Sequence, residues 1–155
     1  MRLVSAIVGG SLLLGACGGT ETGVCTELRE LADSQSFAHV IDPDSVTYRS
    51  DPPTSGPHLA VPAPVGILDA PIVAPLQVRL LESGAALIQW EGVDDRTVSE
   101  LEELAGPTVV IAPGIDLPDS IVATAWTWKL TCTDLDIAAL SEFVTTRPKS
   151  APGRD

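Results

Sequence analysis

The spacing of hydrophobic residues predicts two regular segments in the first part of the chain. Residues 25–31 place Leu28 and Leu31 three positions apart among charged residues, which favours a short amphipathic helix. Residues 78–90 are mostly apolar with Gly84 near their middle, and this pattern is typical of one bent strand or a hairpin.

A proline-rich segment lies between these two patterns. Residues 51–75 contain seven prolines, the first two being Pro52 and Pro53. Each proline fixes φ and lacks an amide donor, so the segment forms neither an interior helix nor a central strand. We therefore predict a long loop, and ordered loops of this length usually carry a function.

The next part of the chain has clearer helix and strand signals. Residues 94–104 have apolar residues at helical spacing, and Thr97 with Glu100 fits a capping box. Gly106 provides a stop for this predicted helix. The β-branched run at residues 108–112 then predicts a short strand.

The last regular segments are a longer strand and a second helix. Residues 121–130 predict one strand, on which Trp126 and Trp128 would share a face. Core packing is the main interpretation of these tryptophans, and a ligand-facing platform is the alternative. Residues 134–144 predict an amphipathic helix capped by Thr133.

Together these elements predict the α+β class. We expect a small, mostly antiparallel sheet with two or three helices packed on one of its faces, together with the long Pro-rich loop. Residues 25–147 are long enough for a single domain with a buried core. Residues 148–155 have the composition of a disordered tail.

The N-terminal residues predict export and lipidation. Residues 1–16 combine a positive start with a short apolar run, which is the layout of a secretory signal peptide and too short for a permanent span. The sequence Leu14-Gly15-Ala16-Cys17 resembles the bacterial lipobox, so Cys17 is expected to carry a diacylglycerol with acyl chains such as palmitate. The alternative is that Cys17 is a small apolar residue near an ordinary cleavage site. In the lipoprotein interpretation, residues 17–24 form the lipidated N-terminus and a flexible tether.

The net charge of the chain limits the classes of molecule that the protein can bind. The formal net charge of −12 excludes nucleic acid, whose phosphates require a basic surface. It also means that a lipid, rather than a basic patch, would hold the protein on the outer face of the cell membrane. The partners that remain are the membrane, through the lipid anchor, and either an envelope protein or a small ligand.

Once Cys17 is assigned to lipid, two cysteines remain in an oxidising compartment. A disulfide between Cys25 and Cys132 is expected, and two buried free thiols are the alternative. The bridge would close a loop of about 108 residues and contribute about 4–5 kcal/mol in the chain-entropy account.

One short motif gives the chain a family resemblance. Tyr48 is followed by Pro-Pro-Thr-Ser-Gly-Pro-His at residues 52–58, and Ala-Thr-Ala-Trp occurs at residues 123–126. With His-Val at residues 39–40, these motifs resemble the bacterial domain-of-unknown-function family 3105, an uncharacterised extracytoplasmic domain. The resemblance covers roughly residues 39–143 and implies no known activity.

The same motif supplies the candidate binding residues. Its prolines and glycine would hold Thr54, Ser55 and His58 in a rigid arrangement, with a purely packed loop as the alternative. Glu82 and His39 complete the candidate set. They are also weak candidates for zinc or copper ligands, because two imidazoles alone under-coordinate either ion.

The sequence departs from the family at two of these positions. The resemblance implies histidines near Arg79 and at Ser83, where this chain has none. No cofactor is therefore expected.

Two function hypotheses follow from these residues. The first is a non-enzymatic binding or interaction module of the cell envelope, and the alternative is a degenerate metal-dependent or histidine-assisted hydrolase. No catalytic motif such as a nucleophile elbow or a zinc-binding helix is present, so no catalytic residue is assigned. Close approach of His39, His58 and Glu82 in the folded chain would favour the hydrolase.

Overall fold

The computed structural model describes residues 23–148 and residue 151, so the predicted signal peptide, Cys17 and most of the predicted tether lie outside the described residues. The strands in this part are β1 (Cys25–Arg29), β2 (His39–Val40), β3 (His58–Leu59), β4 (Ala86–Trp90), β5 (Val109–Pro113), β6 (Ile121–Ala125) and β7 (Trp128–Cys132). The helices are α1 (Ala74–Glu82), α2 (Asp95–Glu102), α3 (Ile137–Thr146) and the short 3-10 helix η1 (Pro43–Ser45).

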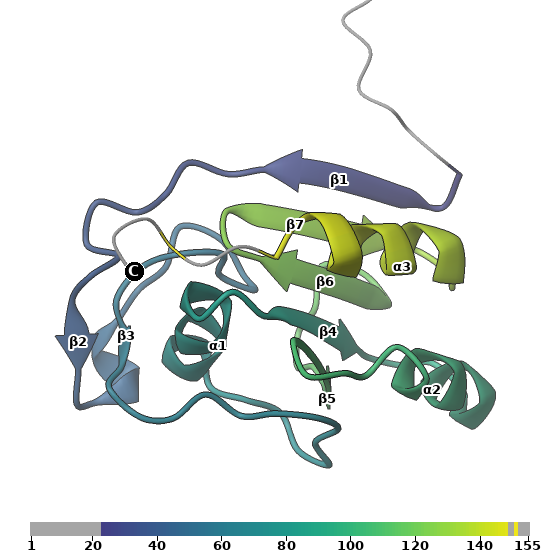
Figure 1. The fold of residues 1–155 in the computed structure, drawn as a ribbon, viewed down its shortest axis with the longest axis horizontal. Helices are drawn as coiled ribbons and strands as arrows, with labels where there is room; N and C mark the ends of the chain where they lie inside the picture. Colours follow the sequence, from purple (N-terminus) through teal and green to yellow (C-terminus); the bar gives the residue numbers. More distant parts are fainter. Residues whose placement is uncertain (1–22, 149–150, 152–155) are drawn as a thin grey trace, which may run out of the picture.

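These elements form the predicted α+β fold (Figure 1). The main sheet has the strand order β1-β7-β6-β4-β5, and β2 pairs with β3 in a separate small sheet. Neighbours in the main sheet are antiparallel except β4 and β5, which run parallel and are connected through α2. The mostly antiparallel sheet is thus confirmed.

Apolar side chains cover both faces of the main sheet. Along β4, Ala86 and Ile88 belong to one core cluster, while Leu87 belongs to the other. Helices α2 and α3 contribute Leu101 and Phe143 to the first cluster. Helix α1 packs on the opposite face, so the expectation that the helices share one face is wrong. Each face of β4 carries apolar side chains, and each needs its own cover.

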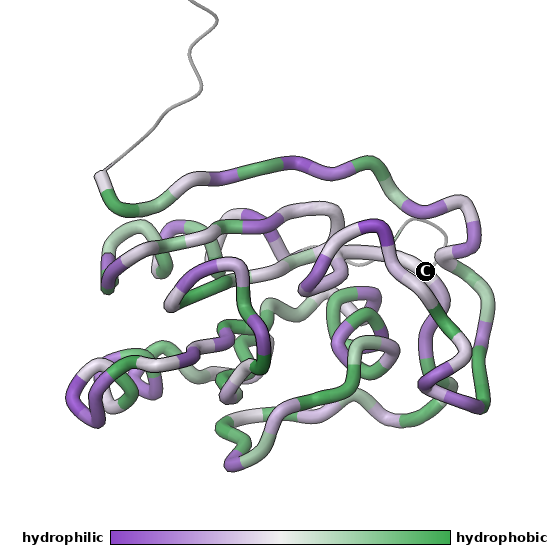
Figure 2. The backbone as a smooth tube through the Cα atoms, turned by 180° about the vertical axis from the view of Figure 1, so that it is seen from behind, coloured by the Kyte–Doolittle hydropathy of each residue, from purple (hydrophilic) through white to green (hydrophobic). Residues whose placement is uncertain are grey.

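The predicted helix at residues 25–31 is wrong, because this segment contains strand β1. Its five residues pair antiparallel with β7, from Cys25 opposite Cys132 to Arg29 opposite Trp128. Leu28 is 56% exposed and Leu31 is 86% exposed, so their spacing does not mark a buried face. A helix this short is only marginally stable, and the hydrogen bonds to β7 stabilise the strand more strongly. Figure 2 shows β1 as the outermost strand, with hydrophobic and hydrophilic positions interleaved.

The predicted strand at residues 78–90 is a helix followed by a strand. Pro75 stands in the first turn of α1, where a missing amide costs nothing, and the residues after it are mostly good helix formers. Gly84 has φ 89°, the left-handed conformation that ends many helices. The glycine therefore separates α1 from β4 and does not lie in a hairpin turn.

The predicted long strand at residues 121–130 is a hairpin of β6 and β7. Ala125 pairs with Trp128, which leaves Trp126 and Thr127 as the turn. Thr127 has φ 62°, an uncommon value for a β-branched residue. Because the chain reverses here, Trp126 packs in the cluster under α1 and Trp128 packs against the other cluster. The two tryptophans do not share a face.

The two predicted helices of the second half are present, with different N-caps. The Asp94 side chain accepts a hydrogen bond from the Thr97 amide at 2.8 Å and caps α2. The Asp136 side chain accepts one from the Ala139 amide at 2.9 Å and caps α3. The predicted capping box and the predicted Thr133 cap are therefore wrong. Aspartate directly before the first turn is among the strongest N-caps.

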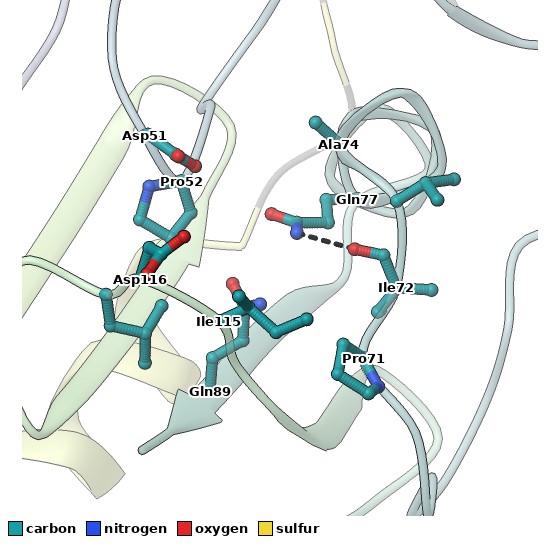
Figure 3. A pocket seen from close by; sticks show the side chains of 11 residues that line it. Asp51, Pro52, Pro71, Ile72, Ala74, Gln77, Gln89, Ile115 and Asp116 are labelled. Carbon is teal, nitrogen blue, oxygen red and sulfur yellow. Dashed lines mark hydrogen bonds between the residues drawn. The ribbon is translucent and has the colours of Figure 1, made fainter. Parts of the chain in front are cut away.

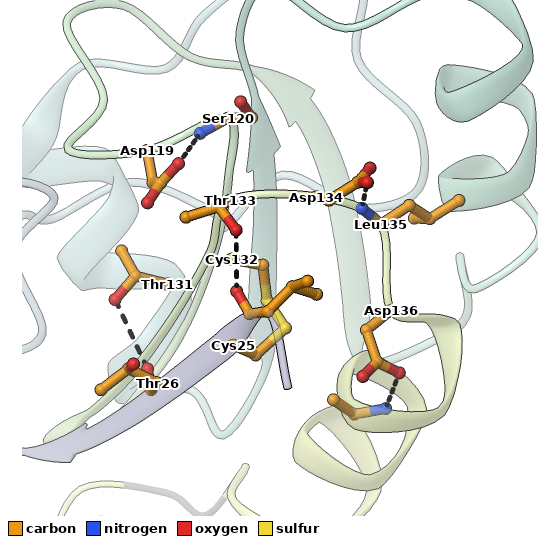
Figure 4. Close-up of a disulfide and its surroundings, with 12 residues drawn as sticks. Cys25, Thr26, Asp119, Ser120, Thr131, Cys132, Thr133, Asp134, Leu135 and Asp136 are labelled. Atoms are coloured by element: carbon orange, nitrogen blue, oxygen red, sulfur yellow. Dashed lines mark hydrogen bonds between the residues drawn. A yellow bond between two sulfur atoms is a disulfide. The ribbon is translucent and has the colours of Figure 1, made fainter. Parts of the chain in front are cut away.

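The expected disulfide joins Cys25 to Cys132, and Figure 4 shows it between β1 and β7. The two residues face each other in register with a Cα–Cα distance of 4.1 Å. Next to them, the Thr133 amide donates to the Val24 carbonyl at 3.0 Å. The bridge thus fixes the start of the edge strand to the interior of the sheet.

One residue of the C-terminal segment departs from the predicted disordered tail. Ala151 is buried in the cluster under α1, and its amide donates to the Glu82 carbonyl at 3.1 Å. The chain after α3 therefore returns to the face of the sheet that α1 covers.

Candidate functional site

The Pro-Pro-Thr-Ser-Gly-Pro-His motif is packed inside the domain. Residues 52–58 are all buried. The Asp33 amide donates to the Ser55 hydroxyl at 2.9 Å, and the Tyr48 hydroxyl donates to the Pro57 carbonyl at 2.5 Å. Burial and the Asp33 charge raise the pKa of Tyr48 to about 12, so its hydroxyl remains a donor at neutral pH. The Ser55 hydroxyl and the Pro57 carbonyl of the motif are thus hydrogen-bonded within the protein.

Glu30 connects this motif to the main sheet. Its carboxylate accepts hydrogen bonds from Thr54 at 2.6 Å and Ser50 at 2.8 Å, and it lies 3.1 Å from the Lys129 ammonium. Burial alone would raise the pKa of Glu30. The hydrogen bonds from Thr54, Ser50 and Lys129, with the Lys129 charge, outweigh burial and lower it. Glu30 is therefore charged and firmly held at neutral pH.

The same region supports the turn between β6 and β7. The Thr127 amide donates to the Thr54 carbonyl at 3.0 Å, and the Thr127 carbonyl accepts from the Glu30 amide at 2.9 Å. These bonds hold Thr127 in its left-handed conformation. The family motif therefore acts as a brace for the central hairpin.

His58, the last residue of the motif, lies against α1. Its Nε2 is 2.7 Å from Glu82 Oε2, and His58 is fully buried while Glu82 is 3% exposed. Strand pairing places His39 opposite His58, with ring centroids 4.9 Å apart in an edge-to-face arrangement. The folded chain thus brings His39, His58 and Glu82 together.

Burial of His58 favours a neutral ring. Burial lowers the pKa of His58 most, and the charges of His39 and Arg79 lower it further. Glu82 and the Gly56 carbonyl act in the opposite direction, but the net pKa lies below 6.5. The contact with Glu82 is close in distance, yet Nε2 has no hydrogen bond of acceptable angle within the described residues.

Arg79 occupies a position where the family resemblance implies histidine. Its guanidinium lies 3.4 Å from Glu82 Oε2 and donates to the Val61 carbonyl at 2.9 Å. In the part of the chain that the structure covers, no group of three or more His, Cys, Asp or Glu side chains is arranged to hold a metal ion. His58 and Glu82 join the loop to α1, whereas His39 is exposed.

A cavity lies elsewhere, on the face of the sheet that α1 covers. It has a volume of about 470 Å³, which is in the range of small-ligand sites. Two walls of the cavity come from the Pro-rich loop, one at Pro52 and one at the turn before α1. The loop after β5 forms a third wall. The lining residues are Asp51, Pro52, Pro71, Ile72, Val73, Ala74, Gln77, Gln89, Ile115, Asp116 and Leu117.

Two buried glutamines form the polar part of this cavity (Figure 3). Gln77 of α1 is 6% exposed and Gln89 of β4 is 2% exposed. The Gln77 amide nitrogen donates to the Ile72 carbonyl at 2.8 Å. The Oε1 atoms of both glutamines have no hydrogen-bond partner among the described residues. A buried acceptor without a partner is costly, so these oxygens are suited to a bound molecule or water.

The sequence interpretation missed both glutamines. Neither is charged, and neither belongs to a known motif. Gln89 did carry a signal, because it is the polar residue within the apolar strand β4. A buried polar side chain in a strand requires a partner, and that requirement is visible in the sequence. Gln77 gave no such signal, since the helix containing it was interpreted as a strand.

The fold and cavity describe a small α+β domain with a ligand-sized hollow and a buried, structural family motif. A model of the family described as "Protein of unknown function (DUF3105)" matches residues 39–154, and the chain belongs to this family. No curated protein and no solved structure matches the chain. None of the helices described between residues 23 and 148 is long and apolar enough to cross a membrane.

Proposed function

We propose that this protein is an extracytoplasmic lipoprotein, anchored to the cell membrane through Cys17, whose domain is a non-enzymatic binding module. The ligand is a small molecule that enters the cavity between the Pro-rich loop, α1 and the loop after β5. The observation that carries the proposal is a pair of buried oxygens, those of Gln77 and Gln89, that have no hydrogen-bond partner among the described residues and lie in a cavity of about 470 Å³.

The anchor rests on the lipobox and on the disulfide. A bridge between Cys25 and Cys132 fits an oxidising compartment outside the cytoplasm. A diacylglycerol supplies two acyl chains, which together suffice for stable membrane attachment. Cys25 lies eight positions after Cys17 in the chain. At about 3.5 Å per residue, the domain stays within roughly 28 Å of the lipid.

The cavity is a better binding site than the family motif. Thr54, Ser55 and His58 are buried, and Thr54 and Ser55 are hydrogen-bonded within the protein. A ligand would have to break these contacts. In the cavity, by contrast, a ligand would satisfy acceptors that have no partner within residues 23–148 and 151. Binding there leaves the brace around the hairpin intact.

The hydrolase alternative is favoured by one contact, the 2.7 Å approach of His58 to Glu82. A histidine oriented by a carboxylate is the arrangement of a general base. Both side chains are closed off from solvent, however, so a substrate reaches them only if the loop moves. Ester hydrolysis that is lost in His58→Gln, while the variant keeps the wild-type melting temperature, would support this alternative.

The anchor is tested by replacing Cys17. We expect the wild-type protein in the membrane fraction, labelled by a metabolic fatty-acid probe. The variant Cys17→Ser should lose the label and leave the membrane. Cys25→Ser serves as the control because it removes a different cysteine and should retain the label. An unlabelled wild-type protein would contradict the anchor.

Ligand binding is tested by thermal denaturation of the detergent-purified chain with a library of small metabolites. A ligand at a hundred times its Kd adds about 2.7 kcal/mol to the free energy of unfolding. This raises the melting temperature by roughly 10 °C for a domain of this size. Gln77→Met should abolish the shift. The exposed Gln35 provides the matched control, since Gln35→Met should keep it. A ligand that stabilises Gln77→Met as strongly as wild type would contradict the site.

A further inference from the structure

The polar floor of the cavity presents acceptors. The Ile72 carbonyl can only accept, so it fixes the Gln77 amide with its nitrogen toward Ile72 and its Oε1 free. Gln89 Oε1 is a second acceptor without a protein partner among the described residues. A ligand that fits this floor must donate hydrogen bonds.

The rim of the cavity is negatively charged. Asp51 and Asp116 line it, and Figure 3 shows them across the cavity from Gln77. No Lys, Arg or His is among the described lining residues, and neither aspartate has an ion pair within the described part of the chain. The rim therefore favours a cation.

The loop that carries Asp116 is held in place before any ligand arrives. The amides of Asp116 and Leu117 donate to the two carboxylate oxygens of Glu91, at 3.3 and 2.8 Å. Asp116 has φ 53°, a backbone conformation that these contacts maintain. Such preorganisation lowers the entropy lost on binding.

The remaining walls are apolar. Pro52, Pro71, Ile72, Ile115 and Leu117 surround the space between the aspartates and the glutamines. A bare metal ion or a fully hydrophilic cation would leave these walls in contact with water. The cavity therefore combines sites for a donor, a positive charge and an apolar body.

We propose that the cavity binds a small molecule with a protonated primary amine on an apolar body. This inference rests on the proposed function, because it names the ligand class of the same cavity. An ammonium group has three N–H donors and no acceptor, which matches the oxygens of Gln77 and Gln89. Its charge is opposite to that of Asp51 and Asp116. A carboxylate of the same shape would meet like charge at Asp51 and Asp116 and could not donate to the two glutamine oxygens.

The test compares three probes of similar shape by calorimetry on the detergent-purified chain: 2-phenylethylamine, 2-phenylethanol and phenylacetate. We expect the amine to bind at least about tenfold more tightly than the alcohol, and phenylacetate most weakly. An unscreened unit charge about 4 Å away corresponds to roughly a fivefold change in affinity in water. Asp116→Asn should therefore weaken amine binding about fivefold and leave alcohol binding unchanged.

The control variant is Asp44→Asn, which makes the same change of charge in η1, away from the cavity. It should leave amine affinity within twofold of wild type. Asp44 and Asp116 are both exposed, so neither substitution removes a buried contact. Equal weakening by Asp116→Asn and Asp44→Asn would overturn the inference, because the charge effect would then belong to the whole surface.

Two further outcomes separate this inference from the proposed function. If the alcohol, the carboxylate or a library compound without an amine binds more tightly than the amine and loses affinity in Gln77→Met, the cavity is a ligand site and the amine assignment is wrong. If no probe and no library compound binds, both the ligand class and the binding function are wrong.

Discussion

The glycine of the family motif is expected to tolerate no side chain. Gly56 has φ 131°, a conformation that costs other residues about 1–3 kcal/mol. A Cβ there would lie 2.9 Å from Tyr48 Cε1 and 3.1 Å from Tyr48 Cδ1. Tyr48 is restrained by its hydrogen bond to the Pro57 carbonyl, so displacing it costs about another 1–3 kcal/mol. We expect Gly56→Ala to lower the free energy of unfolding by about 4 kcal/mol.

Urea denaturation followed by circular dichroism measures this loss. Gly66→Ala is the matched control, because Gly66 has φ 77° and a Cβ there would have no atom within 4 Å. The control variant carries only the backbone penalty, about 1 kcal/mol. The difference between the two variants contains the contact with Tyr48 and any larger backbone penalty at Gly56.

A double-mutant cycle tests the cause. In the Tyr48→Ala background the obstructing ring is gone, so Gly56→Ala should cost about 1–3 kcal/mol less than in wild type. The reasoning is refuted if Gly56→Ala costs no more than Gly66→Ala, or if the costs of Gly56→Ala and Tyr48→Ala are additive.

Three other predictions address the sheet and its brace. Replacing Cys25 and Cys132 by serine should lower the free energy of unfolding by about 5 kcal/mol, and an unchanged urea midpoint would contradict the loop-closure argument. Glu30→Gln should destabilise the protein at pH 7. Because the pKa of Glu30 is lowered from 4.5, its contribution is present above that pH and lost below it, so the unfolding curves of wild type and variant should converge in acid. Thr127→Gly should relieve the left-handed strain and raise the free energy of unfolding by about 1 kcal/mol, whereas a loss measured by urea titration would show that the side chain outweighs the strain.

The sequence predicted the fold class and several elements correctly, because their signals were local. Strand β5 is a β-branched run, and α2 and α3 show apolar residues at helical spacing. The disulfide followed from compartment and cysteine number. These inferences needed no knowledge of which strands pair.

Two of the errors arose where a distant contact decides the local structure. Residues 25–31 form strand β1 because β7 offers a partner across the sheet and Cys132 fixes the register. The turn at Thr127 is held by Thr54 and Glu30, from segments far away in the sequence. No local pattern reports such bonds.

The candidate site shows the same limit. The motif containing Thr54, Ser55 and His58 is distinctive in sequence, and the structure uses it for packing. The cavity instead depends on Gln77 and Gln89, which become neighbours only when α1 covers the sheet. A distinctive motif can thus identify a fold while its side chains are buried and packed within the protein.

The position of the disulfide would matter for a protein held by its own N-terminus, as proposed above. Cys25 is the first residue of β1, at the end of the strand that leads toward Cys17. A pull on the proposed lipid would reach the covalent link to β7 before it reached the strand hydrogen bonds beyond Cys25. Without that link, the same force would open the edge strand one pair at a time. The bridge would therefore pass mechanical load directly to β7, an inner strand of the sheet.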